Sequence, residues 1–114
     1  MSNISNTKIE KNIERISLTK EELLTDMDST LSYIKSIFTL HQPIYIIVEG
    51  RYSITIQNPL SQYVGICENY YTISLIDTNK NEVISKIDIN NSFLFLHTLI
   101  GIIKDLLLHI NRIL

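Results

Sequence analysis

The chain has 114 residues, of which 45% are hydrophobic, and it carries a net charge of −2. This length corresponds to one domain, and the apolar content is sufficient for a packed core, which excludes a wholly disordered chain. The single cysteine excludes a disulfide-rich scaffold.

The composition is skewed in a way that tracks AT-rich codons. Ile, Asn, Lys, Tyr, Phe and Met together account for 50 residues, whereas Gly, Ala, Arg and Pro account for 8. The skew indicates an AT-rich genome, such as that of a bacterium, phage, plasmid or organelle. Individual isoleucines are therefore not taken as signs of function.

The N-terminal region mixes polar and charged residues and lacks the apolar run of a secretory signal. We assign residues 1–16 to an N-terminal arm, either a short docking helix or a frayed end, and residues 17–114 to a single domain. The lone Cys67 fits a reducing compartment, so we expect a cytoplasmic protein. The uncharged stretch 89–103 is diluted by polar residues, and we therefore expect no membrane span.

Residues 19–40 have the pattern of an amphipathic helix. Thr19 and Glu22 have the spacing of a capping box, and Leu18 and Leu23 have the spacing of a hydrophobic staple. Pro43 predicts that the helix ends before it. The apolar stripe comprises Leu23, Leu24, Met27, Leu31, Ile34, Ile37 and Phe38.

Two β-hairpins follow the helix. Apolar residues alternate on both sides of Glu49-Gly50 within residues 44–57, and again within residues 69–77 and 82–89 on both sides of a polar turn. Residues 62–67 are a weaker strand or a connector. The sequence therefore predicts an antiparallel sheet of four or five strands.

A long helix over residues 91–114 ends the chain, and we expect it to pack on the sheet. The predicted fold is therefore α+β. The helix is apolar over more than half of its circumference, which exceeds what one sheet face requires. We interpret the excess as the interface of a homodimer, although the N-terminal helix or the arm could cover it instead. The predicted interface residues are Phe95, Leu99, Ile103, Leu107, Ile110 and Leu114.

The sequence lacks the spacings that enzymes and metal sites require. His97 and His109 are out of phase on a helix, and no pair of cysteines or histidines has metal-ligand spacing. Three scattered glycines exclude a phosphate-binding loop. We expect no metal, no cofactor and no catalytic residue.

Five of the six tyrosines fall between residues 45 and 71. Tyrosine is common at protein interfaces, but it is also a normal strand residue and a platform for base stacking. Few basic residues accompany the tyrosines, so we expect no nucleic-acid partner. The residues predicted to bind a protein partner are Tyr45, Arg51, Tyr52, Tyr70 and Tyr71.

Residues 70–88, with the sequence YYTISLIDTNKNEVISKID, precede a long apolar helix. This region resembles the closing hairpin and last helix of class I type III secretion chaperones, and helix 19–40 with hairpin 44–57 is similar in order to the start of that family. The resemblance implies a small homodimer that binds an extended segment of a client protein.

Together these features predict a non-catalytic protein-binding module, a small homodimeric protein that acts as a chaperone or adaptor. Two alternatives remain open. One is a phage or viral inhibitor of a host defence system. The other is a single-stranded nucleic-acid-binding protein that stacks bases on Tyr52, Tyr70 and Tyr71.

Overall fold

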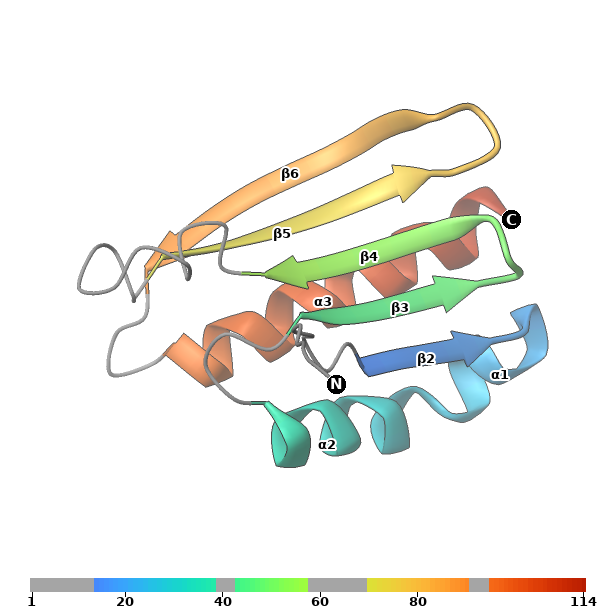
Figure 1. Cartoon of the computed structure of the whole chain (residues 1–114). Helices are drawn as coiled ribbons and strands as arrows, with labels where there is room; N and C mark the ends of the chain where they lie inside the picture. The colour runs from blue at the N-terminus through green and yellow to red at the C-terminus, as the bar shows by residue number, and fades with distance from the viewer. Residues whose placement is uncertain (1–13, 39–42, 58–69, 91–94) are drawn as a thin grey trace, which may run out of the picture.

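The described residues fold as an α+β protein with three helices on one side of a five-stranded sheet (Figure 1). The computed structural model describes residues 14–38, 43–57, 70–90 and 95–114. In chain order the elements are β2 (Glu14–Leu18), α1 (Lys20–Thr25), α2 (Met27–Ile37), β3 (Ile44–Val48), β4 (Tyr52–Gln57), β5 (Tyr70–Asp77), β6 (Glu82–Asn90) and α3 (Phe95–Ile113). The predicted fold class is confirmed.

The sheet has the strand order β2-β3-β4-β5-β6. Strands β3 to β6 are antiparallel to their neighbours, whereas β2 runs parallel to β3. Every second residue of β3, β4 and β5 is a large buried side chain, because alternate residues of a strand point to opposite faces. These side chains form the core together with the inner faces of the helices.

Strand β2 corrects the predicted boundary between arm and domain. In the sequence, Ile9, Ile13 and Ile16 recur at helical spacing, which favours a short docking helix over residues 1–16. Glu14–Leu18 instead forms a strand whose residues 16 and 18 turn inward while Arg15 and Ser17 stay exposed. The remaining arm residues, 1–13, lie outside the described residues, as does the predicted connector 62–67.

The predicted helix 19–40 is present, but as two helices separated at Asp26. Thr25 and Asp26 favour a break because short polar side chains compete with the helical hydrogen bonds, and the Thr25 hydroxyl donates to the Glu21 carbonyl at 3.0 Å. The capping box is confirmed. The Glu22 N–H donates to the Thr19 hydroxyl, and the Thr19 N–H donates to the Glu22 carboxylate.

One residue of the predicted apolar stripe is misplaced. Leu24 is 53% exposed, whereas Leu23, Met27, Leu31 and Ile34 are buried. The buried residues keep a spacing of three or four residues across both helices, and Leu24, one position after Leu23, lies about 100° further round the helix, at the edge of the stripe.

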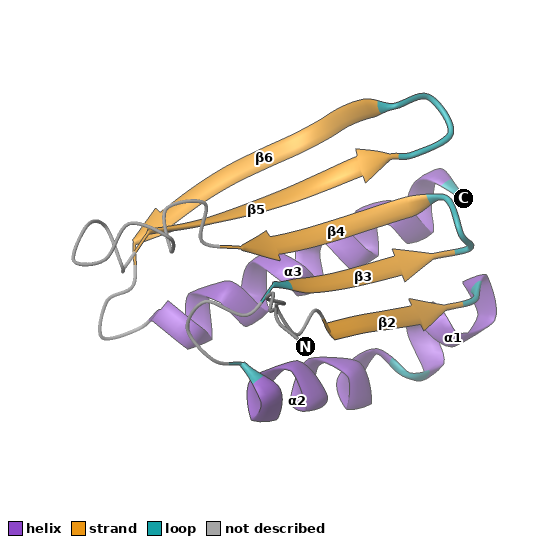
Figure 2. Cartoon of the chain, viewed as in Figure 1, coloured by secondary structure: helices purple, strands orange, loops and turns teal. Residues whose placement is uncertain are grey.

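Both hairpins form as predicted (Figure 2). Glu49 and Gly50 have φ values of 55° and 62°, which is the left-handed conformation that a tight turn requires and that glycine adopts without cost. Asn81, at the end of the second turn, has a φ of 54°. An irregularity between Leu75 and Ile76 shifts the β5–β6 register by one residue, so Val83 rather than Ile84 pairs with Ile76.

Helix α3 is covered on two sides within the chain. It contacts β4 on one side and both α1 and α2 on the other, and it lies behind the central strands in Figure 1. This arrangement accounts for its wide apolar surface, because each contact buries a different part of its circumference. The alternative interpretation of the apolar excess, cover by the N-terminal helical region, therefore describes this structure.

Candidate protein-binding surface

The sheet has one face that no described helix covers, which we call the open face. Figure 1 is viewed from that side, with α3 behind the sheet. Strand alternation and register place the following residues on it: Arg15, Ser17, Tyr45, Ile47, Ser53, Thr55, Gln57, Thr72, Ser74, Ile76, Val83, Lys86 and Asp88.

Small hydroxyl side chains occupy the centre of the open face. Ser53, Thr55, Thr72 and Ser74 come from the adjacent inner strands β4 and β5. Ser53 and Thr72 are buried at this face. The result is a polar strip with aliphatic side chains such as Ile47 and Ile76 beside it.

An aromatic and a cation pair at one side of the open face. Arg15 and Tyr45 are opposite each other in the β2–β3 register, and the Arg15 guanidinium lies 5.6 Å from the centre of the Tyr45 ring. A guanidinium at this distance is attracted to the face of the ring. Tyr45, one of the predicted partner-binding residues, is thus half-buried on the open face, where its ring contacts Arg15.

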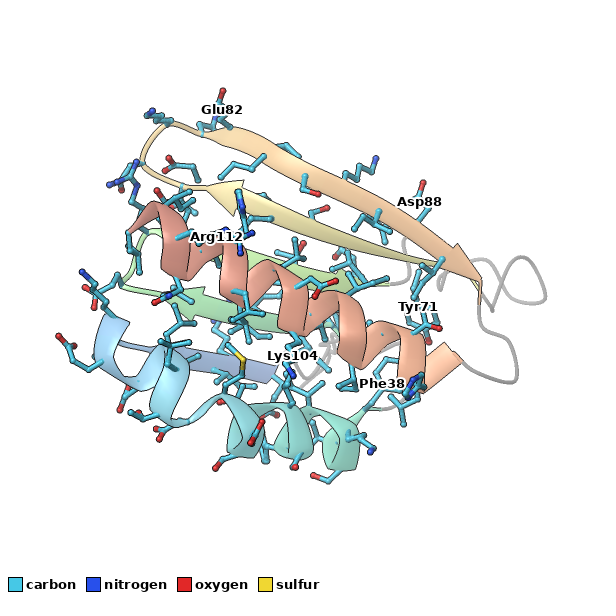
Figure 3. All side chains as sticks on the ribbon, turned by 180° about the vertical axis from the view of Figure 1, so that it is seen from behind. Phe38, Tyr71, Glu82, Asp88, Lys104 and Arg112 are labelled. Atoms are coloured by element: carbon cyan, nitrogen blue, oxygen red, sulfur yellow. The ribbon has the colours of Figure 1, made fainter. Side chains whose placement is uncertain are left out.

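Two of the predicted partner-binding tyrosines lie in the core instead. Tyr52 is 4% exposed and Tyr71 is 1% exposed, so the prediction that they form a binding surface is corrected. Both are in phase with inward-facing aliphatic residues of their own strands, and the Phe38 ring packs 5.5 Å from the Tyr71 ring (Figure 3). The side chain of Tyr70 lies outside the described residues.

Arg51, the last residue of the β3–β4 turn, forms an ion pair with Asp77 at the end of β5. Its Nη2 lies 2.9 Å from Asp77 Oδ2, and its Nε donates to Asp77 Oδ1 at 3.2 Å. The guanidinium also lies 4.8 Å from the centre of the Tyr52 ring. Arg51 is therefore occupied in structural contacts, which leaves it a secondary part of any binding surface.

The Asp77 carboxylate also organises the turn that follows it. It accepts hydrogen bonds from the N–H groups of Asn79 and Lys80, at 3.1 and 3.4 Å. The hydrogen bonds from Arg51, followed by those from the turn backbone, lower the pKa of Asp77 although partial burial opposes the shift. The segment that begins at Asp77 is thus a turn, as the sequence predicts.

The residues predicted to form a dimer interface on α3 are mostly core residues. Leu99, Ile103, Leu107 and Ile110 are fully buried against the sheet and the other helices, which corrects their assignment to an exposed interface. Leu114 is half-buried and packs against the same core, and the side chain of Phe95 lies outside the described residues. These side chains are buried because α3 packs against β4 on one side and against α1 and α2 on the other.

A side-chain hydrogen bond joins the edge strand β2 to helix α2. The Tyr33 hydroxyl on α2 donates to the Glu14 carboxylate at 2.7 Å. This hydrogen bond raises the pKa of Tyr33, because it favours the protonated phenol beside a negative charge. It anchors β2 against α2 at the end of the strand where the described chain begins.

The sequence places Ser53, Thr55 and Gln57 on one outward face of their strand, because they alternate with apolar residues, but the alternation does not indicate what that face does. Arg15, Lys86 and Asp88 belong to no motif that would assign them to the same face.

Within the described ranges, no three His, Cys, Asp or Glu side chains gather as a metal site would require. No helix in the described part of the chain has the length and apolar character to cross a bilayer. A scan against protein-family models and searches of curated proteins and of solved structures find no match to this chain.

Proposed function

We propose that the chain is a non-catalytic protein-binding module, a small homodimeric protein that acts as a chaperone or adaptor, and that it binds its partner through the open face. The observation that carries the proposal is that the described helices cover one face of the sheet, while the other carries hydroxyl and aliphatic side chains that no described helix covers. A cytoplasmic setting is part of the proposal and rests on the lone Cys67.

The chemistry of the open face suits a polypeptide partner. Serine and threonine hydroxyls both donate and accept hydrogen bonds, so they adapt to peptide groups, while Ile47 and Ile76 supply apolar contact. Tyr45 adds a large contact area with a polar end, a property that recurs in protein-binding surfaces. The face carries few charges, and they lie on its outer strands β2 and β6.

The nucleic-acid alternative is weakened by the positions of the aromatic residues. Two of the three tyrosines that it requires, Tyr52 and Tyr71, are buried on the helix side. The open face offers the cations Arg15 and Lys86 on opposite edge strands. Proteins that bind single strands combine a continuous basic groove with accessible aromatic rings.

The alternative of a phage or viral inhibitor of host defence concerns the identity of the partner rather than the surface. An inhibitor of this kind is also a small binding protein, and the open face would serve it equally. The AT-rich composition is compatible with such a source.

The test is a selection of peptides that bind the open face. A displayed library of random peptides is selected on the wild-type protein and then on two charge-matched variants, Ile47→Asp in the open face and Leu24→Asp on α1. Ile47 is half-buried on the open face, and Leu24 is an exposed residue of the helical layer.

We expect enriched peptides that bind the wild type and the Leu24→Asp variant but not the Ile47→Asp variant, provided that circular dichroism shows both variants folded. Peptides that bind all three proteins equally would overturn the assignment of the open face. A library that yields no binder would count against a protein-binding module. Binding of a labelled single-stranded oligonucleotide that weakens steeply with added salt would favour the nucleic-acid alternative.

A further inference from the structure

Strand β6 is the last strand of the sheet in the described part of the chain, where it pairs with β5 on one side only. With nine residues it is the longest of the described strands. An edge of this kind is a template for pairing with another strand, and natural proteins usually protect it with charges or bulges. Figure 1 shows β6 at one side of the sheet, away from α2.

The side chains of β6 divide by face. Lys86 and Asp88 are exposed on the open face, whereas Ile87 and Ile89 are half-buried on the helix side. Figure 3 shows Asp88 projecting from the outer strand. A row that alternates basic, apolar, acidic and apolar residues is well suited to meet its own antiparallel copy.

Symmetry restricts how two copies of β6 can pair. Two identical strands pair antiparallel only about a two-fold axis normal to the sheet, so each face of one copy continues as the same face of the other. The axis then passes midway between the two copies of one residue, so that this residue lies directly opposite its own copy. Every other residue faces the one placed symmetrically on the far side of that centre.

The charges select the central residue. A centre at Lys86 opposes two ammonium groups, and a centre at Asp88 opposes two carboxylates. Like charges directly opposite each other destabilise a strand pair. A centre at Ser85 places Ile84, at the register irregularity, opposite Lys86.

A centre at Ile84 falls at the register irregularity between β5 and β6, where a regular ladder is interrupted. A centre at Ile87 avoids the irregularity, because the pairing then runs mainly through residues 85–89. It places Lys86 opposite Asp88 twice and Ile87 opposite itself. Ser85 meets Ile89 on the helix side.

We infer that two copies of this chain associate through antiparallel pairing of their β6 strands, centred on Ile87, to form one continuous ten-stranded sheet. This inference gives a location to the homodimer of the proposed function and rests on that part of it. One Asp88 oxygen accepts from the Thr72 hydroxyl at 2.9 Å, which holds the carboxylate on the open face where the second copy's Lys86 would meet it.

The charge pattern provides the test. In Lys86→Glu the edge carries two acids at these positions, and in Asp88→Lys it carries two bases. Each variant alone therefore repels its own copy, but the two variants mixed together restore opposite charges at both contacts. Lys104→Glu, on an exposed part of α3, is the matched charge-reversal control.

We expect light scattering to give twice the chain mass of 13.2 kDa for the wild type and Lys104→Glu at high micromolar concentration. Each edge variant should dissociate at least roughly tenfold more readily. Their equimolar mixture should regain the dimer. A monomeric wild type, an edge variant that dimerises like the wild type, or a mixture that stays monomeric would each overturn the inference.

A cross-linking experiment tests the register without changing a charge. In a background with Cys67→Ser, Ile87→Cys places two cysteines directly opposite each other, within the Cα separation that a disulfide requires. Ser85→Cys is the control, because its two copies lie four residues apart along the strands, about 13 Å. Rapid cross-linking of Ile87→Cys alone supports the register, and equal cross-linking of both variants or of neither contradicts it.

The outcome separates this inference from peptide binding. A wild-type monomer that still binds the selected peptides would overturn the β6 dimer and leave the binding function standing. A dimer with this register that binds no peptide would support the β6 pairing and count against the peptide-binding function.

Discussion

Arg51 and Asp77 form a two-bond ion pair that joins the start of β4 to the end of β5. The Arg51 carbonyl also accepts from the Thr78 N–H at 2.9 Å and from the Thr78 hydroxyl at 2.6 Å. Both hairpin turns lie at the same end of the sheet (Figure 2). The pair therefore fixes the two hairpins to each other at that end.

The ion pair predicts a pH dependence of stability. The pKa of Asp77 is lowered in the folded state, so its contribution is present above the unfolded pKa and is lost as the pH falls through the folded value. We expect Asp77→Asn to lower the melting temperature at pH 7, and the difference from the wild type to shrink as the pH falls below about 4. Melting curves across pH 2–7 measure it.

Asp105→Asn is the control for this series, because Asp105 is an exposed carboxylate on a different element, helix α3. Its melting temperature should follow that of the wild type at every pH. An Asp77→Asn variant that melts like the wild type at pH 7 would show that the ion pair does not stabilise the fold.

Leu107 is fully buried on α3, so its truncation should destabilise the fold rather than separate subunits. We expect Leu107→Ala to lower the free energy of unfolding by about 2–5 kcal/mol. Urea denaturation measures this change, and Lys104→Ala on the exposed side of α3 should lie within about 0.5 kcal/mol of the wild type. A Leu107→Ala protein with unchanged stability would contradict the placement of this residue in the core.

The capping box at the start of α1 should also be measurable. Thr19→Ala removes the oxygen that accepts the Glu22 N–H at 3.2 Å. We expect a loss of about 1 kcal/mol in the free energy of unfolding, while Thr19→Ser retains most of it. Equal stability of the alanine and serine variants would mean that the cap does not contribute.

Gly50 adopts a left-handed conformation with a φ of 62° in the β3–β4 turn. A Cβ atom added there meets nothing within 4 Å, so the cost of Gly50→Ala is conformational rather than steric with neighbours. We expect a loss of about 1–2 kcal/mol. Gly101→Ala is the control, since it lies in helix α3 with open space around it and should stabilise the helix by up to about 1 kcal/mol.

The sequence predicts those elements whose signals are local. The capping box at Thr19, the turn at Glu49-Gly50 and the alternation in β5 each depend on residues close together in the chain. Strand β2 was missed because its partner β3 lies beyond two helices, and its five residues alone carry too short an alternation to outweigh the helical spacing of the preceding isoleucines.

The candidate surface was harder to predict than the fold. The prediction that Tyr52 and Tyr71 bind a partner rests on residue type, because tyrosine is common at protein interfaces. Their positions two residues before Ile54 and Ile73 indicate instead that they share the buried face of their strands. Which face of a sheet the helices cover is decided by packing across the whole chain. For the same reason the apolar excess of α3 did not distinguish a second copy from cover by α1 and α2.

The parallel placement of β2 has a consequence for the order of folding. The β3–β4 hairpin closes over a short turn, whereas β2 reaches β3 only after the α1–α2 segment has crossed over, which requires closing a much longer loop. We expect β2 to dock late and to open first. Amide hydrogens of β2 should therefore exchange with solvent faster than those of β4, and equal protection in the two strands would show that the sheet forms as a single unit.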